Sequence, residues 1–390
     1  MTGSGAAVLA GVGIILVAAN LRPAVVAVAP LVDEIKASTG WNSSVTGLLT
    51  TLPVLVFGLA APAAPRCAAR FGMERTVFGA LVVLVAGIVL RLVPEAAGLF
   101  AGSVLVGVGI GICNVVLPSL IKRDFAHRSG LMTGVYSATL SAGAAVASGS
   151  VVPINDAIGG NWRVSLALWM IPALVATLLW VPQLWRMHRA ELTTSREPLW
   201  RNRMAWAITI FMAAQSMIFY AFAAWLPEFL IDRGMTPAHA GAVLALSQLA
   251  GMVASLIAPI IAVRFRDQRI FTGLNMIGCA IGFVGLLTTE RWPTLWAMCV
   301  MTGPGAGIGL ALLFMVLRST STAQTSQVSG MAQCAGYLLA ALGPVGVGVL
   351  HDVTGSWTVA MSALGLVLIP QALSTWLAAR DDTMTPARVF

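Results

Sequence analysis

The chain has 390 residues, of which 58% are hydrophobic and 10% are charged. A soluble domain carries roughly a quarter charged residues, so this composition excludes an ordinary soluble protein. The net charge of +8 comes from short basic clusters between apolar segments, whereas a nucleic-acid-binding protein needs a continuous basic patch. We therefore expect a protein that lies in the lipid bilayer and binds no nucleic acid.

Twelve apolar runs, separated by polar breaks, follow one another along the chain. Most have about the 20 residues that a transmembrane helix needs. The expected helices cover residues 5–30, 43–65, 74–92, 96–121, 130–153, 163–185, 205–230, 238–263, 270–289, 293–317, 327–350 and 357–379. The first run is too long for the core of a signal peptide, and no cleavage site follows it, so we expect it to remain as the first span.

Basic residues are concentrated in the breaks after the even-numbered helices. Residues 66–75 and 264–269 each hold three arginines, while acidic residues such as Glu95 and Asp352 mark the alternate breaks. Because cytoplasmic loops accumulate lysine and arginine, we expect both termini in the cytoplasm. The sequence thus predicts a multi-pass protein of the bacterial inner membrane.

The two halves of the chain resemble each other. GVGIGI at 107–112 matches GAGIGL at 305–310, and ARF at 69–71 matches VRF at 263–265. A parallel duplication of this kind is the internal symmetry of transporters built from two six-helix bundles. No strand precedes the glycines and no Walker lysine follows them, so we interpret them as sites of close helix approach and not as phosphate loops.

The longest polar stretch lies between these halves. We expect an all-α membrane protein with twelve transmembrane helices in two pseudo-symmetric six-helix bundles. The N-terminal bundle covers 1–185, a cytoplasmic linker covers 186–204, and the C-terminal bundle covers 205–390.

The five cysteines are scattered singly along the apolar runs, and no histidine lies beside them at ligand spacing. We expect free thiols, no metal and no cofactor. No nucleophile, base or metal cluster falls at membrane depth, so the sequence argues against an enzyme and against a channel.

Four segments carry a resemblance to a known family. They are NLRP at 20–23, GVGIGICNVVLPSLIKRDF at 107–125, RSGLMTGVYSA at 128–138 and AWLPEFL at 224–230. In these segments the chain resembles the major facilitator superfamily, and within it the cyanate and 2-nitroimidazole transporter group. The resemblance implies a secondary transporter that works by alternating access, with its substrate site between the bundles at mid-membrane.

The superfamily's loop motif after the second helix is present in altered form. Arg70, Gly72 and Arg75 fit the pattern, but its aspartate is missing and Glu74 is the nearest acidic residue. We therefore do not assume the usual gating ion pair between the bundles.

Arg22 is the most informative single residue. It lies about 24 Å into the first helix at 1.5 Å per residue, beyond the bilayer midplane. A charge at that depth costs at least about 2.5 to 3.5 kcal/mol, so it should face a hydrated cavity and have a partner. No carboxylate lies at comparable depth, and a planar guanidinium suits a carboxylate, a nitro group or a small linear anion. The alternatives are a structural arginine bonded to backbone carbonyls, or one that reaches the outer surface beside Asp33 and Glu34.

Other polar residues extend this candidate substrate site. Asn20 lies beside Arg22, and Pro23 should bend the helix there. The offset of 198 residues between the halves maps Arg22 onto Tyr220, and Gln215 lies earlier on the same helix. The remaining substrate-binding candidates at mid-helix depth are Thr50, Asn114, Tyr136, Gln248, Gln333 and Tyr337. We expect about half of these to line the cavity and the rest to be contacts between helices.

All four histidines fall in loops or at helix ends, so the nearby candidates for energy coupling are Glu228, near the outer end of the seventh helix, and the pair Asp33 and Glu34. A coupled proton could travel through Glu228 or together with the substrate. Simple facilitated movement is the alternative. Arg318 ends the tenth helix, where we interpret it as a charge that reaches the inner surface, although attraction of anions to the inner mouth is a second reading.

Two functions remain open. The first is a monomeric carrier for a small anionic or strongly polar planar solute, which is cyanate-like, nitro- or imidazole-like, or a small organic anion. The alternative is proton-coupled multidrug efflux of hydrophobic compounds, for which the methionines and aromatic residues would form an adaptable wall. Arg22 favours the first function, because a hydrophobic drug would leave its charge unpaired.

Overall fold

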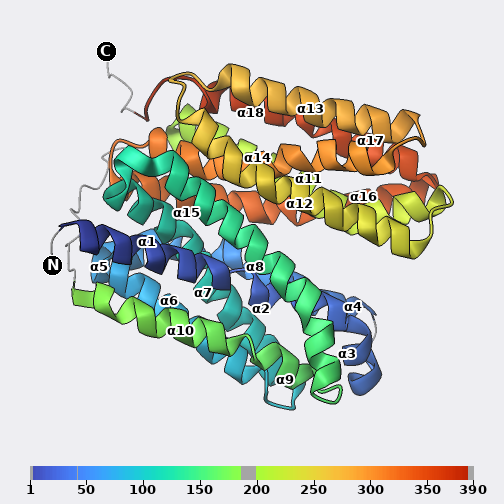
Figure 1. The fold of residues 1–390 in the computed structure, drawn as a ribbon, viewed down its shortest axis with the longest axis horizontal. Helices are drawn as coiled ribbons and strands as arrows, with labels where there is room; N and C mark the ends of the chain where they lie inside the picture. The colour runs from blue at the N-terminus through green and yellow to red at the C-terminus, as the bar shows by residue number, and fades with distance from the viewer. Residues whose placement is uncertain (1–2, 42, 186–198, 385–390) are drawn as a thin grey trace. The chain divides into compact units, whose positions relative to one another are not determined.

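The computed structural model describes residues 3–41, 43–185 and 199–384, and every regular element among them is a helix (Figure 1). The lipid bilayer explains this, because it offers no hydrogen-bond partners and each segment that crosses it must pair its own backbone N–H and C=O groups. The all-α fold class predicted from the sequence is confirmed.

The described residues of the first half of the chain contribute the elements α1 to α10 and three short 3₁₀ turns. Their bounds are α1 (Gly3–Asn20), α2 (Pro23–Val26), η1 (Ala29–Leu31), α3 (Val32–Thr39), α4 (Ser43–Ala60), α5 (Ala63–Phe71), α6 (Met73–Leu90), α7 (Ala96–Asp124), η2 (Ala126–Arg128), α8 (Ser129–Ala157), α9 (Trp162–Ala167), α10 (Met170–Trp180) and η3 (Val181–Trp185).

The second half begins with another 3₁₀ turn and continues with eight helices. Their bounds are η4 (Leu199–Arg201), α11 (Arg203–Asp232), α12 (Pro237–Ala262), α13 (Arg269–Thr288), α14 (Pro293–Leu317), α15 (Thr322–Ala340), α16 (Leu342–Thr354), α17 (Trp357–Leu366) and α18 (Leu368–Ala378).

Several consecutive helices combine into one span. Within the described residues, eleven spans are long and apolar enough to cross a bilayer, and the pair α4 and α5, bent by 55°, makes a twelfth. These spans agree closely with the predicted ones, and 293–317 is matched without change. The eleventh starts at Thr322 instead of 327, because the Ser321 hydroxyl accepts a hydrogen bond from the Gln324 N–H and so caps a polar first turn.

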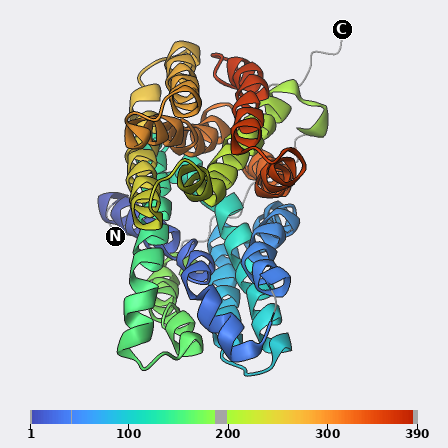
Figure 2. The same ribbon diagram turned by 90° about the vertical axis from the view of Figure 1, so that its right-hand side faces the viewer.

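The helices group into two compact units (Figure 2). The first comprises residues 1–126 and 139–194, and the second comprises 127–138 and 195–390. Residues 129–138 at the start of α8 therefore belong to the second unit, which the predicted boundaries did not include. Residues 186–198 of the predicted linker lie outside the described residues.

Small residues bring the helices of the first unit together. A Cβ atom at Gly102 of α7 would lie 2.5 Å from the Gly87 carbonyl oxygen of α6, and one at Gly109 would lie 2.6 Å from the Ala80 carbonyl oxygen. Only glycine allows backbones to approach this closely. An apolar cluster that includes Leu31 packs the residues after α2 and helix α3 against α4, α7, α8 and α9.

Glycines bring the helices of the second unit together in the same way. A Cβ atom at Gly303 of α14 would meet Cys279 of α13, and one at Gly309 would lie 2.7 Å from the Ser255 carbonyl oxygen of α12. The predicted role of both glycine series in close helix approach is therefore confirmed. The core of this unit is formed around aromatic residues, with Phe222 packed edge-on against Phe283.

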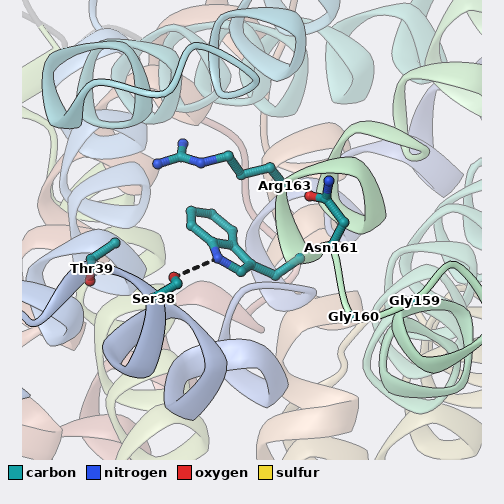
Figure 3. A pocket seen from close by; sticks show the side chains of 7 residues that line it. Ser38, Thr39, Gly159, Gly160, Asn161 and Arg163 are labelled. Atoms are coloured by element: carbon teal, nitrogen blue, oxygen red, sulfur yellow. Dashed lines mark hydrogen bonds between the residues drawn. The ribbon is translucent and has the colours of Figure 1, made fainter.

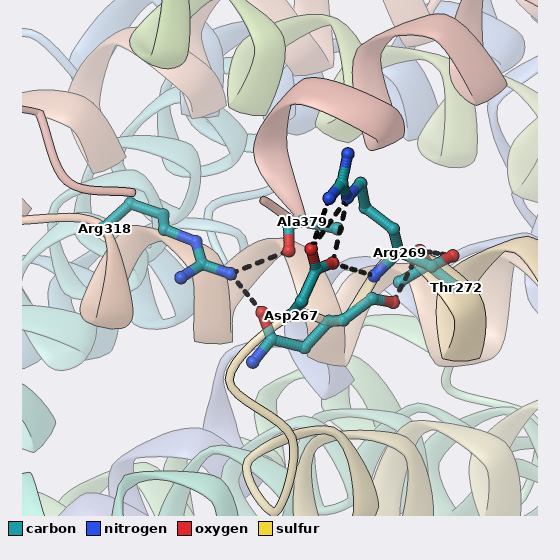
Figure 4. A network of polar contacts seen from close by, with 6 residues as sticks. Asp267, Arg269, Thr272, Arg318 and Ala379 are labelled. Atoms are coloured by element: carbon teal, nitrogen blue, oxygen red, sulfur yellow. Dashed lines mark hydrogen bonds and ion pairs between the residues drawn. The ribbon is translucent and has the colours of Figure 1, made fainter. Parts of the chain in front are cut away.

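Arg318 departs from its predicted role, because it is buried and does not reach for the surface. Its Nε donates to the Ala378 carbonyl and its Nη2 to the Ala379 carbonyl, each at 3.0 Å, and Nη2 also donates to Gln268 (Figure 4). The last carbonyls of a helix have no partner in their own helix. Arg318 therefore caps the C-terminal end of α18.

Asp267 lies beside this cap. Its carboxylate pairs with Arg269 at 2.6 Å, and this hydrogen bond lowers the pKa of Asp267 (Figure 4). This ion pair is local to the start of α13, whereas the contacts of Arg318 with Gln268, Ala378 and Ala379 join the ends of α13, α14 and α18.

Candidate solute-binding site

The first membrane span is broken at Arg22. α1 ends at Asn20 and α2 begins at Pro23, because proline has no N–H for the Ala19 carbonyl and its ring cannot follow an ideal helix. Gly143 of α8 packs against the break, where a Cβ atom would lie 2.7 Å from the Ala19 carbonyl oxygen. The helix is thus interrupted at the position where the sequence predicted a bend, and the span as a whole continues from Val8 to Leu31.

Arg22 occupies the N-cap position of α2 and is half-buried. Its carbonyl oxygen accepts hydrogen bonds from Val25 N at 3.1 Å and Val26 N at 3.0 Å. Arg22 therefore directly precedes the four-residue helix α2, and these two bonds fix its backbone to the first turn of that helix. A polar side chain at a break in a membrane helix is a common arrangement for substrate contact in transporters.

The other candidates of the first unit have different surroundings. Asn20 is 5% exposed, and its Nδ2 donates to the Leu16 carbonyl at 2.8 Å within its own helix. Asn114 is buried in α7. Thr50 belongs to α4, but its side chain lies outside the described part of the structure.

In the second unit, Gln215 lies in the contact between α11 and α14. It is 2% exposed, its Nε2 donates to the Ser216 hydroxyl at 2.7 Å, and a Cβ atom at Gly307 would lie 2.9 Å from its Cβ. Tyr220 lies further along α11, half-buried, with its ring edge-on to Phe219 at 5.3 Å between centroids.

Of the remaining candidate site residues in the second unit, some are buried and others are exposed. Gln333 and Tyr337 are buried in α15, and the Gln333 amide donates to the Ser329 hydroxyl at 2.9 Å. Tyr136 is buried in the first half of α8. Gln248 of α12 and the coupling candidate Glu228 of α11 are both exposed.

Sequence reasoning missed Arg91, which lies near the end of the expected helix 74–92 and is the C-cap residue of α6. It is 2% exposed, and its Nη1 donates to the Ala24 carbonyl of α2 at 2.5 Å. Its Nε and Nη2 atoms are also buried and have no hydrogen-bond partner among the described residues. The sequence offers no signal for this burial, because Arg91 stands at the end of an apolar run, where a charge usually reaches solvent.

A shallow pocket of about 370 Å³ lies at the turn between α8 and α9, also in the first unit (Figure 3). Its lining residues are Ser38, Thr39, Gly159, Gly160, Asn161, Trp162 and Arg163. The Trp162 indole N–H donates to the Ser38 hydroxyl at 2.8 Å, and the Arg163 guanidinium stacks 4.3 Å over the Trp162 ring. These contacts tie α3 to α9, and the sequence had not indicated them.

The apolar spans found among the described residues, the charged residue at the break in the first span and the internal duplication are features of a polytopic membrane transporter. Residues 6–344 match the sequence model of the Major Facilitator Superfamily, and the chain belongs to this family of secondary transporters. It is a non-enzymatic, multi-pass membrane protein.

Relatives of named function cover almost the whole chain. The 2-nitroimidazole transporter of Escherichia coli K12 is 40% identical over 374 residues, which is 95% of each protein. The cyanate transport protein CynX of the same organism is 31% identical and covers 91% of this chain and 94% of its own. The chain therefore falls in the group of these two transporters, as its motifs had indicated.

Solved structures support the fold alone. The proton:xylose symporter XylE, bound to 6-bromo-6-deoxy-D-glucose, superposes with a TM-score of 0.79 over 98% of both chains, at 14% identity. At that identity the likeness carries no information on the solute.

Proposed function

We propose that this transporter moves a small planar solute, anionic or strongly polar, across the bacterial inner membrane by alternating access, and that Arg22 binds it. The observation that carries the proposal is the place of Arg22 at the broken first span. Its backbone forms the turn that starts a short helix segment, in a span that must cross lipid. A charge is tolerated there when hydration or a ligand compensates it.

The chemistry of Arg22 indicates the class of solute. A guanidinium presents paired N–H donors in one plane, which suit the two oxygens of a nitro group or carboxylate and also a short linear anion such as cyanate. The relatives that transport 2-nitroimidazole and cyanate fall in this class. We further propose that Tyr220, half-buried in α11, contacts the same solute through its phenol or its ring.

Orientation and energy coupling complete the proposal. The arginine clusters at residues 66–75 and 264–269 support a cytoplasmic location for these parts of the chain and for both termini. Glu228 is exposed in α11, which is compatible with a proton-carrying role. Uptake into vesicles with and without a proton gradient decides this point, because equal initial rates would remove proton coupling.

The central test is a thermal-shift and binding screen of the purified protein against sodium cyanate, 2-nitroimidazole and a lipophilic cation. Ligand occupancy raises the midpoint of unfolding. Loss of charge-assisted hydrogen bonds in Arg22→Ala should weaken cyanate and 2-nitroimidazole binding by about tenfold or more. Arg22→Lys should keep part of cyanate binding, because a point charge attracts an anion without the planar fork.

Arg266→Ala serves as the control, since Arg266 is an exposed arginine after α12. It should leave both affinities unchanged. The proposal is wrong if cyanate and 2-nitroimidazole stabilise the wild type and Arg22→Ala equally. Stabilisation by the lipophilic cation alone would favour multidrug efflux instead.

A further inference from the structure

α2 is a helix of four residues with breaks on both sides, so it needs an anchor outside the first span. At its start, Leu21 N bonds to the Ala18 carbonyl over three residues. At its end, Val28 N bonds to the Val25 carbonyl at 3.4 Å, again over three residues. Because the Val28 N–H turns to residue 25, the Ala24 carbonyl receives no helical donor from it.

Arg91 supplies the missing donor. Its Nη1 lies 2.5 Å from the Ala24 carbonyl oxygen, across 67 residues of sequence. Arg22 accepts the N–H groups of Val25 and Val26, so Ala24 and Arg22 belong to the same rigid turn. A rotation of this turn would therefore redirect Arg22.

The surroundings of Arg91 are built to hold it in place. A Cβ atom at Gly102 of α7 would lie 2.8 Å from the Arg91 Cγ, so glycine at this position makes room for the side chain. The Arg163 guanidinium donates to the Arg91 carbonyl at 3.3 Å and to the Val93 and Pro94 carbonyls at 3.0 and 2.8 Å. Both the stem and the backbone of Arg91 are therefore restrained.

A gain in folding stability does not explain why the Arg91 side chain is buried. None of the ion pairs found among the described residues includes Arg91. Its Nε and Nη2, which form one edge of the guanidinium, are buried without acceptors. A buried charge with one hydrogen bond opposes folding, and an apolar side chain of similar volume is often as stable or more stable.

We infer that Arg91 is a positioning residue for solute binding: through the Ala24 carbonyl it sets the orientation of α2 and thereby of Arg22. The inference rests on the proposed function of Arg22. It explains why a costly charge is kept where apolar packing would serve folding better, since residues that prepare a functional site commonly reduce stability.

The second unit offers a matched control. Arg233, at the end of α11, is partly buried and donates to the Leu286 and Leu287 carbonyls of α13 at 2.7 and 3.1 Å. It makes the same kind of contact as Arg91, but to the end of a helix that carries no candidate solute-binding residue. Arg233→Met thus removes an arginine-to-carbonyl cap without a change near α2.

The experiment compares Arg91→Met, Arg91→Lys and Arg233→Met in the full-length protein. Three quantities are measured: the unfolding midpoint, amide hydrogen exchange over residues 22–28 without ligand, and the affinities for cyanate and 2-nitroimidazole. For Arg91→Met we expect an unfolding midpoint equal to or above that of the wild type. We also expect exchange in α2 to be about tenfold faster and both affinities to be about tenfold weaker.

Arg91→Lys should recover part of the affinity, because an ammonium can still donate to the Ala24 carbonyl. Arg233→Met should lower the unfolding midpoint and leave α2 exchange and both affinities unchanged. Unchanged α2 exchange in Arg91→Met, or a lower midpoint with full affinity, would overturn the inference. If the wild type binds neither probe, the proposed function fails, and α2 exchange by itself then decides whether Arg91 holds the segment.

Discussion

Arg123 of α7 forms an ion pair with Glu74 of α6, with 2.8 Å between Nη1 and Oε1. The side chains are 20% and 6% exposed, so little water screens the pair. The Glu74 carbonyl also accepts the Trp180 indole N–H of α10 at 3.0 Å. Glu74 thus joins three helices of the first unit, although its sequence position had indicated only an imperfect loop motif.

Glu74→Gln should destabilise the protein. The change leaves the partly buried Arg123 with Asp124 as its only ion-pair partner among the described residues, and we expect a loss of about 1 to 3 kcal/mol in unfolding free energy. Chemical denaturation in detergent measures this. The control is Glu95→Gln, the same chemical change at an exposed position, which should alter the free energy by less than about 0.5 kcal/mol. Equal effects of the two substitutions would contradict the assigned role of the pair.

The contact of α8 with α12 depends on Gly134. A Cβ atom at this position would lie 2.5 Å from the Leu256 carbonyl oxygen, which is backbone and cannot move aside alone. Gly134→Ala should therefore cost about 1 to 3 kcal/mol and weaken the hydrogen bond that Ser137 donates to the Ser255 carbonyl at 2.8 Å. Thermal unfolding and initial uptake rates test this together.

Gly149 is the matched control because it lies in the same helix and a Cβ atom there would meet nothing within 4 Å. Gly149→Ala should be neutral or stabilise the protein by up to about 1 kcal/mol, since alanine favours helix more than glycine does. A tolerated Gly134→Ala would show that the two helices are not held in close contact.

Arg318→Met should lower the unfolding free energy by about 3 kcal/mol, because the Ala378 and Ala379 carbonyls and the Gln268 side chain lose their donor. Differential scanning calorimetry measures the effect. The exposed Arg266 supplies the comparison, and Arg266→Met should leave the transition unchanged. Were both variants equally stable, the cap on α18 would contribute nothing.

Pro23→Ala should impair transport more than stability. The substitution restores an N–H at residue 23 for the Ala19 carbonyl and favours a continuous first helix, which turns Arg22 away from its direction at the N-cap. We expect an uptake rate for the bound solute about tenfold lower, equivalent to one lost charge-assisted hydrogen bond. Pro153→Ala, at an exposed proline inside α8, should leave uptake unchanged. Normal uptake by Pro23→Ala would mean that the break is not required.

The membrane spans could be predicted because lipid imposes a local rule. About 20 apolar residues in succession must form a helix there, and no distant partner is needed to specify it. The break at Pro23 could be predicted as well, because a proline interrupts the helix in which it lies and needs no distant partner to do so. The glycine series and the family motifs likewise stand in consecutive residues, so the sequence also indicated close helix approach and the transporter class.

The partners of individual charges were decided by tertiary structure alone. Arg91 meets Ala24 across 67 residues, and Arg318 meets Ala378 across 60. Both arginines end apolar runs, where a charge that reaches solvent and one that caps a distant carbonyl have the same sequence pattern. Arg91 and Arg318 act as caps because folding places uncapped carbonyls of other helices beside them. No pattern in the neighbouring sequence encodes these contacts.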